Sequence, residues 1–329
     1  IITYAITVGA SDIHFDPILN GIQVRLRIDG LLTEYMLVDA TDADMLVNRI
    51  KVFSGMDISE KRLPQDGRWE WSVKTYAVTM RVSSLPSLYG EAIVCRLMGN
   101  EGVHKNLLEL GMDVELQEKI AALLKRPYGL ITICGPTGSG KTATLYAMLR
   151  MLNLKETKLI CLEDPVEATI EGAIQIGINE KIGFTFSKGL RTVLRQDPDS
   201  IMIGEIRDNE TAQLAVKAAL TGHRVITTVH TNTALGVIGR LVDMGVEPYL
   251  LHATLIGSLS QRLVRRIDST THSYQGRLGL FEYLEIPFSD IDWDHVEQYM
   301  FTSLQDSAHL AINSGITTLE EVHRAGILL

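Results

Sequence analysis

This sequence of 329 residues has no long apolar run and only three cysteines. No apolar run approaches the ~20 residues that a membrane-spanning helix needs, and we find no signal-peptide pattern. The three cysteines, Cys95, Cys134 and Cys161, each lie in an apolar, strand-like run. This placement excludes a disulfide framework and a cysteine metal site, and it predicts buried, reduced thiols.

An excess of basic residues is missing too. Lysine and arginine together number 31, against 40 aspartate and glutamate residues, which gives a net charge of −9. This charge argues against a non-specific grip on nucleic acid over the whole surface and leaves only a local basic patch open. No internal repeat or low-complexity segment is present, and 46% of residues are hydrophobic, as in ordinary globular domains. The length suggests two or three domains.

A glycine-rich loop between an apolar run and a helix-like run is the dominant feature of the chain. Glycines let backbone N–H groups converge on phosphate oxygens, and the following helix turns its positive N-terminus to the same anion. Lys141 can reach the β- and γ-phosphates, and Thr142 can place a hydroxyl on Mg²⁺. An ordinary glycine-rich turn is the alternative, but every fixed position of the pattern G-x-x-x-x-G-K-[ST] is satisfied. The residues that match it are Gly135, Pro136, Thr137, Gly138, Ser139, Gly140, Lys141 and Thr142.

The chain ahead of this loop reads as a small α+β domain over residues 1–97, followed by a linker over residues 98–106. Asn20-Gly21 is a hairpin signal, and apolar and polar residues alternate after it. A helix is expected to start at Asp39 or Thr41. A basic loop is expected over residues 61–68. Strands are expected over residues 11–15, 22–29, 69–73, 76–82 and 92–97.

From residue 107 onward, strand-like and helix-like runs alternate, which predicts a mostly parallel sheet covered by helices. We assign residues 107–329 to a P-loop ATPase domain, with its core over 107–249 and a mostly helical C-terminal subdomain over 250–329. Expected strands are 129–134, 159–162, 173–178, 200–203, 225–229 and a pair within 277–286. Expected helices are 113–125, 143–152, 185–196, 209–220, 233–244, 250–264, 290–304 and 319–328.

Three polar clusters follow strands of this sheet, where phosphate sites of such folds lie. Glu163 follows one strand, and it can orient an attacking water or hold Mg²⁺ through its water shell. Glu205 follows another, and Gly204 before it rules out direct metal contact from that position. His230 follows a third and can sense a γ-phosphate by a hydrogen bond. A structural interpretation stays open for each: an acidic loop exit or a structural histidine.

Arginines supplied from a mobile or neighbouring part often stabilise charge in phosphoryl transfer. Arg68 and Arg81 in the first domain are our candidates for this role. The alternative interpretation is that both arginines are solvated strand residues without a catalytic role.

Several further stretches, taken with the loop, resemble the ATPases of type II secretion and type IV pilus assembly. They resemble, in chain order, that family's N-terminal signature, two arginine segments, Asp box, Walker B, His box and late strand pair. The resemblance covers nearly the whole chain and is specific, because several long motifs occur in one order. The stretches are 10–17 (ASDIHFDP), 62–68 (RLPQDGR), 81–86 (RVSSLP), 162–167 (LEDPVE), 203–208 (IGEIRD), 221–223 with 230–232 (TGH and HTN), and 276–282 (GRLGLFE).

The resemblance implies an α/β fold with a RecA-like P-loop core, a helical C-terminal extension and a PAS-like N-terminal domain. It implies that Glu163 activates the attacking water, that Glu205 acts through Mg²⁺, and that His230 senses the γ-phosphate. Arg68 and Arg81 would reach the nucleotide when the first domain closes over the second. ATP and Mg²⁺ are the implied cofactors.

The implied assembly is a homohexamer at the cytoplasmic face of the membrane. It would dock on a polytopic inner-membrane platform protein and drive pilin or pseudopilin assembly. We expect no direct contact with nucleic acid, because the chain has no stripe of basic and aromatic residues. A nucleotide-binding scaffold without turnover is a further alternative, disfavoured because a binder does not need both Glu163 and Glu205.

Two departures narrow the resemblance. Residues 267–275 (IDSTTHSYQ) lack the two C-x-x-C pairs that most assembly members carry, so we expect no zinc there. The chain begins close to the N-terminal signature, and this short form resembles the competence pseudopilus ATPases. Retraction motors also lack the cysteines and are the runner-up, but their Ala-Ile-Arg-Asn-like segment is not evident across residues 308–329, which favours assembly.

Overall fold

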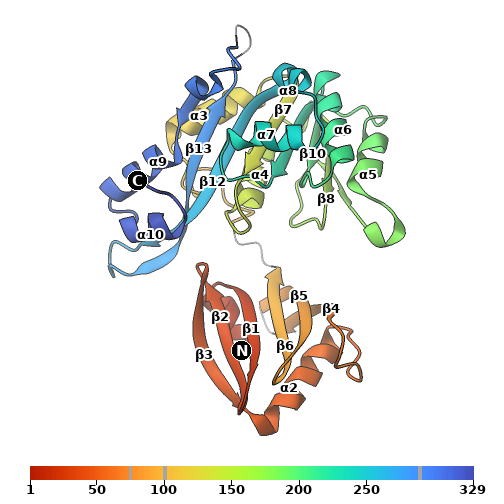
Figure 1. Cartoon of the computed structure of the whole chain (residues 1–329), viewed down its shortest axis with the longest axis vertical. Helices are drawn as coiled ribbons and strands as arrows, with labels where there is room; N and C mark the ends of the chain where they lie inside the picture. Colours follow the sequence, from red (N-terminus) through yellow and green to blue (C-terminus); the bar gives the residue numbers. More distant parts are fainter. Residues whose placement is uncertain (74–75, 99–101, 288–290) are drawn as a thin grey trace. The chain divides into compact units, whose positions relative to one another are not determined.

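The computed structural model describes residues 1–73, 76–98, 102–287 and 291–329. The chain divides into two units, Ile1–Glu101 and Gly102–Leu329, which we call the N-terminal and C-terminal units (Figure 1). Residues 99–101 of the expected linker lie outside the described residues, as does residue 290 at the start of an expected helix.

The N-terminal unit is built on one antiparallel sheet of six strands in the order β3-β2-β1-β6-β5-β4. Two three-stranded meanders meet at the β1–β6 pair, where Phe15 lies opposite Ile93. The helix α1 (Ile2–Thr7) precedes the sheet, and α2 (Ala40–Phe53) joins the two meanders. The strands are β1 (Ala10–Ile18), β2 (Gly21–Ile28), β3 (Leu31–Asp39), β4 (Gln65–Val73), β5 (Tyr76–Ser87) and β6 (Gly90–Met98).

One face of this sheet forms the core of the unit. The alternation of apolar and polar residues places Ile13, Val24 and Met80 on the buried face, where they lie under Ile50 of α2. The helix predicted from Asp39 forms, with Asp39 as its N-cap residue, although the Asp39 side chain makes no cap bond. The helix α1 and the strand β3 were not predicted.

The loop predicted over residues 61–68 is wrong at its end, because Gln65–Val73 is the strand β4. Gln65, Asp66 and Gly67 are poor strand formers, so local propensity predicts a loop. The tertiary contact decides otherwise, since the Arg68 N–H donates to Ser54 O at 3.2 Å. A Cβ on Gly67 would lie 2.2 Å from Ser54 O, so only glycine allows this close approach.

The C-terminal unit contains an eight-stranded sheet in the order β14-β13-β12-β7-β11-β10-β8-β9. The strands from β12 to β9 in this order run parallel, while β13 and β14 add antiparallel pairs at one edge. Counted along the chain without β9, the parallel strands lie in the order 5-1-4-3-2. They are β7 (Gly129–Cys134), β8 (Leu159–Glu163), β9 (Ile174–Gly177), β10 (Ser200–Ile203), β11 (Arg224–Val229) and β12 (Leu255–Ile267), followed by β13 (Tyr274–Glu285) and β14 (Met300–Thr302).

Helices cover both faces of the sheet, which confirms the predicted α/β class. On one face, α3 (Val114–Leu124) and α4 (Lys141–Leu149) pack against Ile131 and Ile133 of β7. The opposite face carries Leu130 and Cys134, which pack against four further helices. These are α5 (Phe186–Val193), α6 (Asn209–Leu220), α7 (Gly236–Asp243) and α8 (Pro248–Thr254), and a short 3-10 turn, η1 (Glu180–Ile182), precedes α5.

The helix predicted over residues 250–264 is wrong from Leu255 onward, where the chain forms β12. The first part of β12, Leu255–Ser260, is nearly all buried on both faces, and its residues are an unbroken run of apolar and small side chains. Such a run cannot be told from a buried helix by periodicity alone. Packing favours the strand, because a Cβ on Gly257 would lie 2.9 Å from Leu123 of α3. The subdomain is therefore not mostly helical.

The helix predicted over residues 290–304 is also wrong in the part that is described. A 3-10 turn, η2 (Val296–Tyr299), and the strand β14 occupy this stretch. The helix α9 (Leu304–Asn313) starts afterwards, because Ser303 and Asp306 form a reciprocal capping box. The last helix, α10 (Leu319–Arg324), is capped by Thr318 and ends before the predicted Leu328. Residues 267–275 close the β12–β13 hairpin.

Candidate active site

The glycine-rich loop joins the end of β7 to the start of α4, in the middle of the sheet. Two of its glycines are required by the fold. Gly135 has φ 145° and a Cβ there would lie 2.5 Å from Ser139 Oγ, while Gly140 has φ 90° and is the N-cap residue of α4. Ser139 is 4% exposed, and its Oγ has no hydrogen-bond partner among the described residues. A buried hydroxyl without a partner beside a helix N-terminus fits an incoming phosphate.

Lys141 lies at the start of α4 and is 8% exposed. Its Nζ donates to Gly135 O at 2.8 Å and to Pro136 O at 2.9 Å, so the ammonium lies against its own loop. Burial lowers the pKa of Lys141, and the nearby charge of Glu205 opposes this shift. The adjacent Thr142 is exposed at the first turn of the helix.

Glu205 and His230 meet at the carboxyl ends of two neighbouring parallel strands, β10 and β11. Glu205 Oε2 lies 3.4 Å from His230 Nε2. Glu205 Oε1 accepts from a terminal guanidinium nitrogen of Arg207 at 2.6 Å. The Glu205 side chain is 16% exposed and that of His230 is 45% exposed, so both can be reached from solvent. The structure thus brings together two of the residues that the sequence singled out, and adds Arg207 to them.

Gly204, directly before Glu205, is held by backbone contacts on two sides. Its N–H donates to Leu162 O at 2.8 Å, and its carbonyl accepts from Thr228 Oγ1 at 2.6 Å. A Cβ at this position would lie 3.2 Å from Leu162 O, which is tighter than ordinary van der Waals contact. Close packing of β10 against β8 therefore favours glycine at this position.

Glu163 ends β8, and its carboxylate is bound by residues of α4 and β9. It accepts hydrogen bonds from Tyr146 Oη of α4 and from Gln175 Nε2 of β9, the latter at 2.9 Å. The residue is 3% exposed, and burial raises the pKa of Glu163. Sequence reasoning missed both partners because they lie in other elements, 17 and 12 residues away. The catalytic role of Glu163 stays a prediction.

Arg68 and Arg81 belong to the N-terminal unit and lie directly opposite each other on β4 and β5. Directly opposite residues share one face of a sheet, so both arginine side chains start from the same face. Both residues are exposed, and Arg68 Nε lies 3.9 Å from Glu70 Oε1. The structure brings these two candidates together, and their action on a nucleotide stays a prediction.

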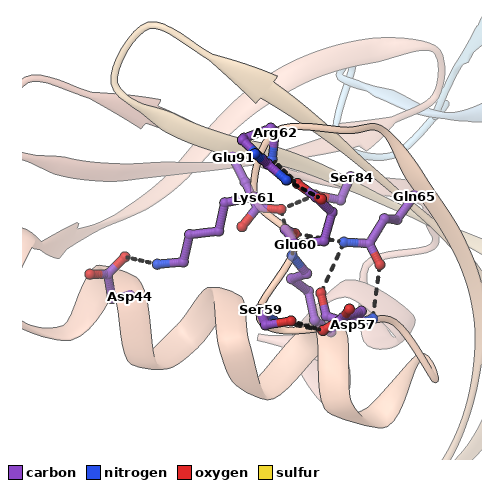
Figure 2. Close-up of polar contacts among 10 residues, drawn as sticks. Asp44, Asp57, Ser59, Glu60, Lys61, Arg62, Gln65, Ser84 and Glu91 are labelled. Atoms are coloured by element: carbon purple, nitrogen blue, oxygen red, sulfur yellow. Dashed lines mark hydrogen bonds and ion pairs between the residues drawn. The ribbon is translucent and has the colours of Figure 1, made fainter.

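A buried polar network fixes the loop ahead of Arg68 (Figure 2). Lys51 of α2 is fully buried, and its Nζ donates to Glu91 Oε1 and to Glu60 O, each at 2.7 Å. Ser84 Oγ donates to the same Glu91 oxygen at 2.9 Å, and Gln65 Nε2 donates to Glu60 O at 2.8 Å. The sequence carried one signal for this network, because Lys51 lies on the buried stripe of α2.

A cavity of about 440 Å³ lies beside the glycine-rich loop, within the C-terminal unit. Its polar lining includes Arg262, which is 8% exposed, and Glu282, which is 6% exposed. Burial raises the pKa of Glu282. The cavity was not predicted, because its walls come from six segments. They are Pro136, Asn232 with Thr233, Arg262, Glu282, Leu304 with Gln305, and residues 325–328.

Comparison with known proteins agrees with this geometry. The family model for type II/IV secretion system proteins matches residues 1–324. The chain belongs to this family. The predicted resemblance to the secretion and pilus ATPases is therefore confirmed at the level of the family.

Three relatives illustrate the range of the family. Type II secretion system ATPase E of Vibrio cholerae is 40% identical over 365 residues, which cover 97% of this chain and 73% of the relative. Type II secretion system protein E of Klebsiella pneumoniae is 50% identical over 266 residues, or 81% of this chain and 54% of the relative. The crystal structure of the pilus retraction motor PilT with bound ADP is 28% identical, with a TM-score of 0.69, and the match covers 98% of this chain and 95% of PilT.

The chain spans about half the length of the first relatives it matches. Within the described residues, no helix is long and apolar enough to cross a membrane.

Proposed function

We propose that this chain is the ATP-hydrolysing part of a homohexameric motor, which powers assembly of a type IV pilus-like filament, a competence pseudopilus or a type II secretion filament. The observation that carries the proposal is the meeting of Glu205 with His230 at adjacent strand ends. The lysine of the glycine-rich loop lies within the electrostatic reach of the same Glu205. A loop that only bound a nucleotide would not need an acid and a histidine beside it.

The residues of the site have the roles that hydrolysis requires. Residues 135–142 bind the phosphates through their backbone N–H groups, except at Pro136, which has none. Lys141 moves from its own loop carbonyls to the β- and γ-phosphates. Glu163 accepts a proton from a water molecule whose oxygen bonds to the γ-phosphorus. The bond from that phosphorus to the β–γ bridging oxygen breaks, which gives ADP and inorganic phosphate. We assign the nucleoside to the cavity of 440 Å³ that Pro136 lines.

The oxygen donors that Mg²⁺ prefers are present at the site. Thr142, exposed at the first turn of α4, would hold the ion directly, and Glu205 would hold it through water, since Gly204 offers no ligand. Bound Mg²⁺ neutralises charge that develops on the phosphates. His230 reports the γ-phosphate by a hydrogen bond, and its contact with Glu205 connects that signal to the acid.

Arg68 and Arg81 complete the site in this proposal by stabilising charge on the transferring phosphoryl group. Their place as a pair of exposed cations on one sheet face supports the assignment. We also propose that the hexamer works at the cytoplasmic face of the membrane, docked on a polytopic platform protein that transmits force to pilins or pseudopilins. The relatives in type II secretion support this setting.

Pilus retraction is the second candidate function. It is favoured by the likeness to the retraction motor PilT, which extends over 98% of this chain. The relatives that are 40% and 50% identical belong to type II secretion and favour assembly. Genetic complementation separates the two, because an assembly motor restores filaments to a strain without them, while a retraction motor removes excess filaments.

The test of hydrolysis uses the chain as it is, with purified protein assayed alone and with membranes that contain the platform protein. We expect slow release of phosphate that rises when the protein forms hexamers and disappears in Lys141→Ala. The matched control is Lys125→Ala, an exposed lysine of the same unit, which should keep the wild-type rate. A wild-type hexamer without ATPase activity under any of these conditions would contradict the proposal.

A further inference from the structure

Tyr146 is a fully buried residue of α4 that the proposed chemistry does not use. It follows Lys141 by five residues on the helix that begins at the glycine-rich loop. Its Oη donates a hydrogen bond to Glu163 Oε2. The same oxygen accepts from the backbone N–H groups of Glu167 at 3.1 Å and Ala168 at 3.3 Å. One phenol thus uses both its donor and its acceptor capacity.

The other carboxylate oxygen of Glu163 is held from a different direction. Gln175 of β9 donates from Nε2 to Glu163 Oε1 at 2.9 Å and to Ala168 O at 2.8 Å. Its Oε1 accepts from the Ile170 N–H at 2.8 Å, so the amide is fully engaged. Every hydrogen bond that the described residues make to the Glu163 carboxylate comes from a neutral group. The carboxylate is therefore fixed in position without a counter-charge.

The phenol connects two parts of the site that must act together. The helix α4 carries Lys141, which contacts the phosphates in the proposed function, and it rises about 1.5 Å per residue. A hydrogen bond from the same helix to Glu163 fixes the distance between the phosphate-binding end of α4 and the acid that ends β8. Because the bonds from Glu167 and Ala168 converge on the same oxygen, the loop after Glu163 moves with it.

We propose that Tyr146 is the positioning residue for Glu163, and that it keeps the acid and the loop after it in register with the phosphate-binding end of α4. This proposal rests on the proposed function, in which Glu163 takes a proton from the attacking water. Tyr146 touches neither the water nor the nucleotide in this scheme. Its contribution is geometric, and small displacements of a catalytic group cost large factors in rate.

The test compares Tyr146→Phe with Tyr283→Phe. The first substitution keeps the ring and removes the hydroxyl that binds Glu163. The second removes a buried hydroxyl that has no hydrogen-bond partner among the described residues, so it is a matched control in the same unit. We expect kcat to fall by about 10- to 100-fold in Tyr146→Phe, while KM for ATP stays unchanged. Tyr283→Phe should keep both values.

The pH profile separates positioning from a loss of general stability. The hydrogen bond from Tyr146 lowers the pKa of Glu163 against the larger effect of burial. Its removal should therefore shift the acid limb of the kcat profile to higher pH, and a merely structural defect would not move that limb. Gln175→Met removes the other neutral donor and should shift it in the same direction, which keeps the proposal testable if Tyr146→Phe fails to fold.

The double variant Tyr146→Phe/Glu163→Gln tests whether Tyr146 acts through Glu163, and it separates failure of this proposal from failure of the proposed function. We expect it to be as slow as Glu163→Gln alone, because a positioning residue has no effect once the acid is gone. If Glu163→Gln is slow but Tyr146→Phe keeps the wild-type kcat and pH profile, the positioning role is overturned and the proposed function stands. If Glu163→Gln itself keeps the wild-type rate, the proposed role of Glu163 is overturned first.

Discussion

Glu91 in the N-terminal unit and Glu163 in the C-terminal unit are both buried carboxylates, at 6% and 3% exposure. They differ in what surrounds them. Glu91 lies 2.7 Å from the ammonium of Lys51, a residue with no exposed surface. Glu163 is held by a phenol and an amide, and no cation bonds to it among the described residues.

The difference separates a group that fixes a shape from a group that is able to react. A buried ion pair depends on both partners, and Lys51 also reaches Glu60 O, so the pair fastens the loop that leads to the strand of Arg68. A carboxylate with neutral donors can gain or lose a proton without leaving a buried cation behind. The comparison predicts that changes at the first network act on stability and that changes at the second act on rate.

The largest expected effect is that of Glu163→Gln on the rate of hydrolysis. We expect kcat to fall by about 10²- to 10⁴-fold, the range for loss of a general base, while nucleotide binding is retained. Phosphate release and binding of a fluorescent ATP analogue measure the two properties. Glu156→Gln, an exposed acid of the same unit, is the control. If the variant hydrolyses ATP at the wild-type rate, then Glu163 is not the general base, and either another residue has that role or the chain is a scaffold.

The next effect is that of Lys51→Met on stability. The substitution leaves the Glu91 carboxylate and Glu60 O buried without their cation, so we expect the free energy of unfolding to fall by about 3 to 5 kcal/mol. Urea unfolding followed by the fluorescence of Trp69 and Trp71, which both lie in the N-terminal unit, measures it.

The double variant Lys51→Met/Glu91→Leu is the matched control for this prediction. Removal of both charges leaves no uncompensated ion, so we expect most of the lost stability to return. If the double variant is as unstable as Lys51→Met alone, then the loss comes from packing around Lys51 and the ion pair is not what holds the loop.

Local patterns predicted the elements around the glycine-rich loop well. The strand over Gly129–Cys134 and the helix over Asn209–Leu220 have the predicted bounds, because Gly135 follows the strand and Asp208 caps the helix. The same patterns failed at β12, whose burial on both faces removes the periodicity that separates strands from helices. They failed again at Gln65–Arg68, where a contact with Ser54 overrides weak strand propensity.

Site residues could be predicted where a local sequence pattern marks them, and could not be predicted where their partners lie far away in the sequence. Glu205 and His230 follow apolar strands directly, and the order of parallel strands then brings them together. The partners of Glu163 could not be found in this way, because Tyr146 lies on a helix interior and reads there as a core residue. Lys51 and Glu91 are 40 residues apart, and sequence alone contains nothing that pairs them.

A smaller effect is expected from Ser84→Ala in the N-terminal network. Ser84 Oγ donates to the same Glu91 oxygen that Lys51 contacts, at 2.9 Å. Since Lys51 still compensates the carboxylate, we expect the free energy of unfolding to fall by only about 1 kcal/mol. The urea midpoint of this variant, measured beside that of Lys51→Met, checks the order of the two contributions. Equal losses would mean that the hydroxyl is as important as the cation.

The smallest expected effect is the dependence of stability on the proton of Glu163. Burial raises the pKa of Glu163 above its ordinary value of 4.5, so the folded chain keeps a proton in a pH range where the unfolded chain has lost it. The stability from this proton is complete below the unfolded pKa and is lost as pH rises through the folded-state pKa.

The free energy of unfolding of the wild type should therefore fall, relative to that of Glu163→Gln, as pH rises from 4.5 toward neutrality. The amide side chain of this variant has the same shape and no titrating proton, which isolates this contribution from all other carboxylates. Urea unfolding of the two proteins in parallel over this range measures the difference. A difference that stays constant with pH would show that burial leaves the proton equilibrium of Glu163 unchanged, and the neutral donors would then be structural contacts like those of Glu91.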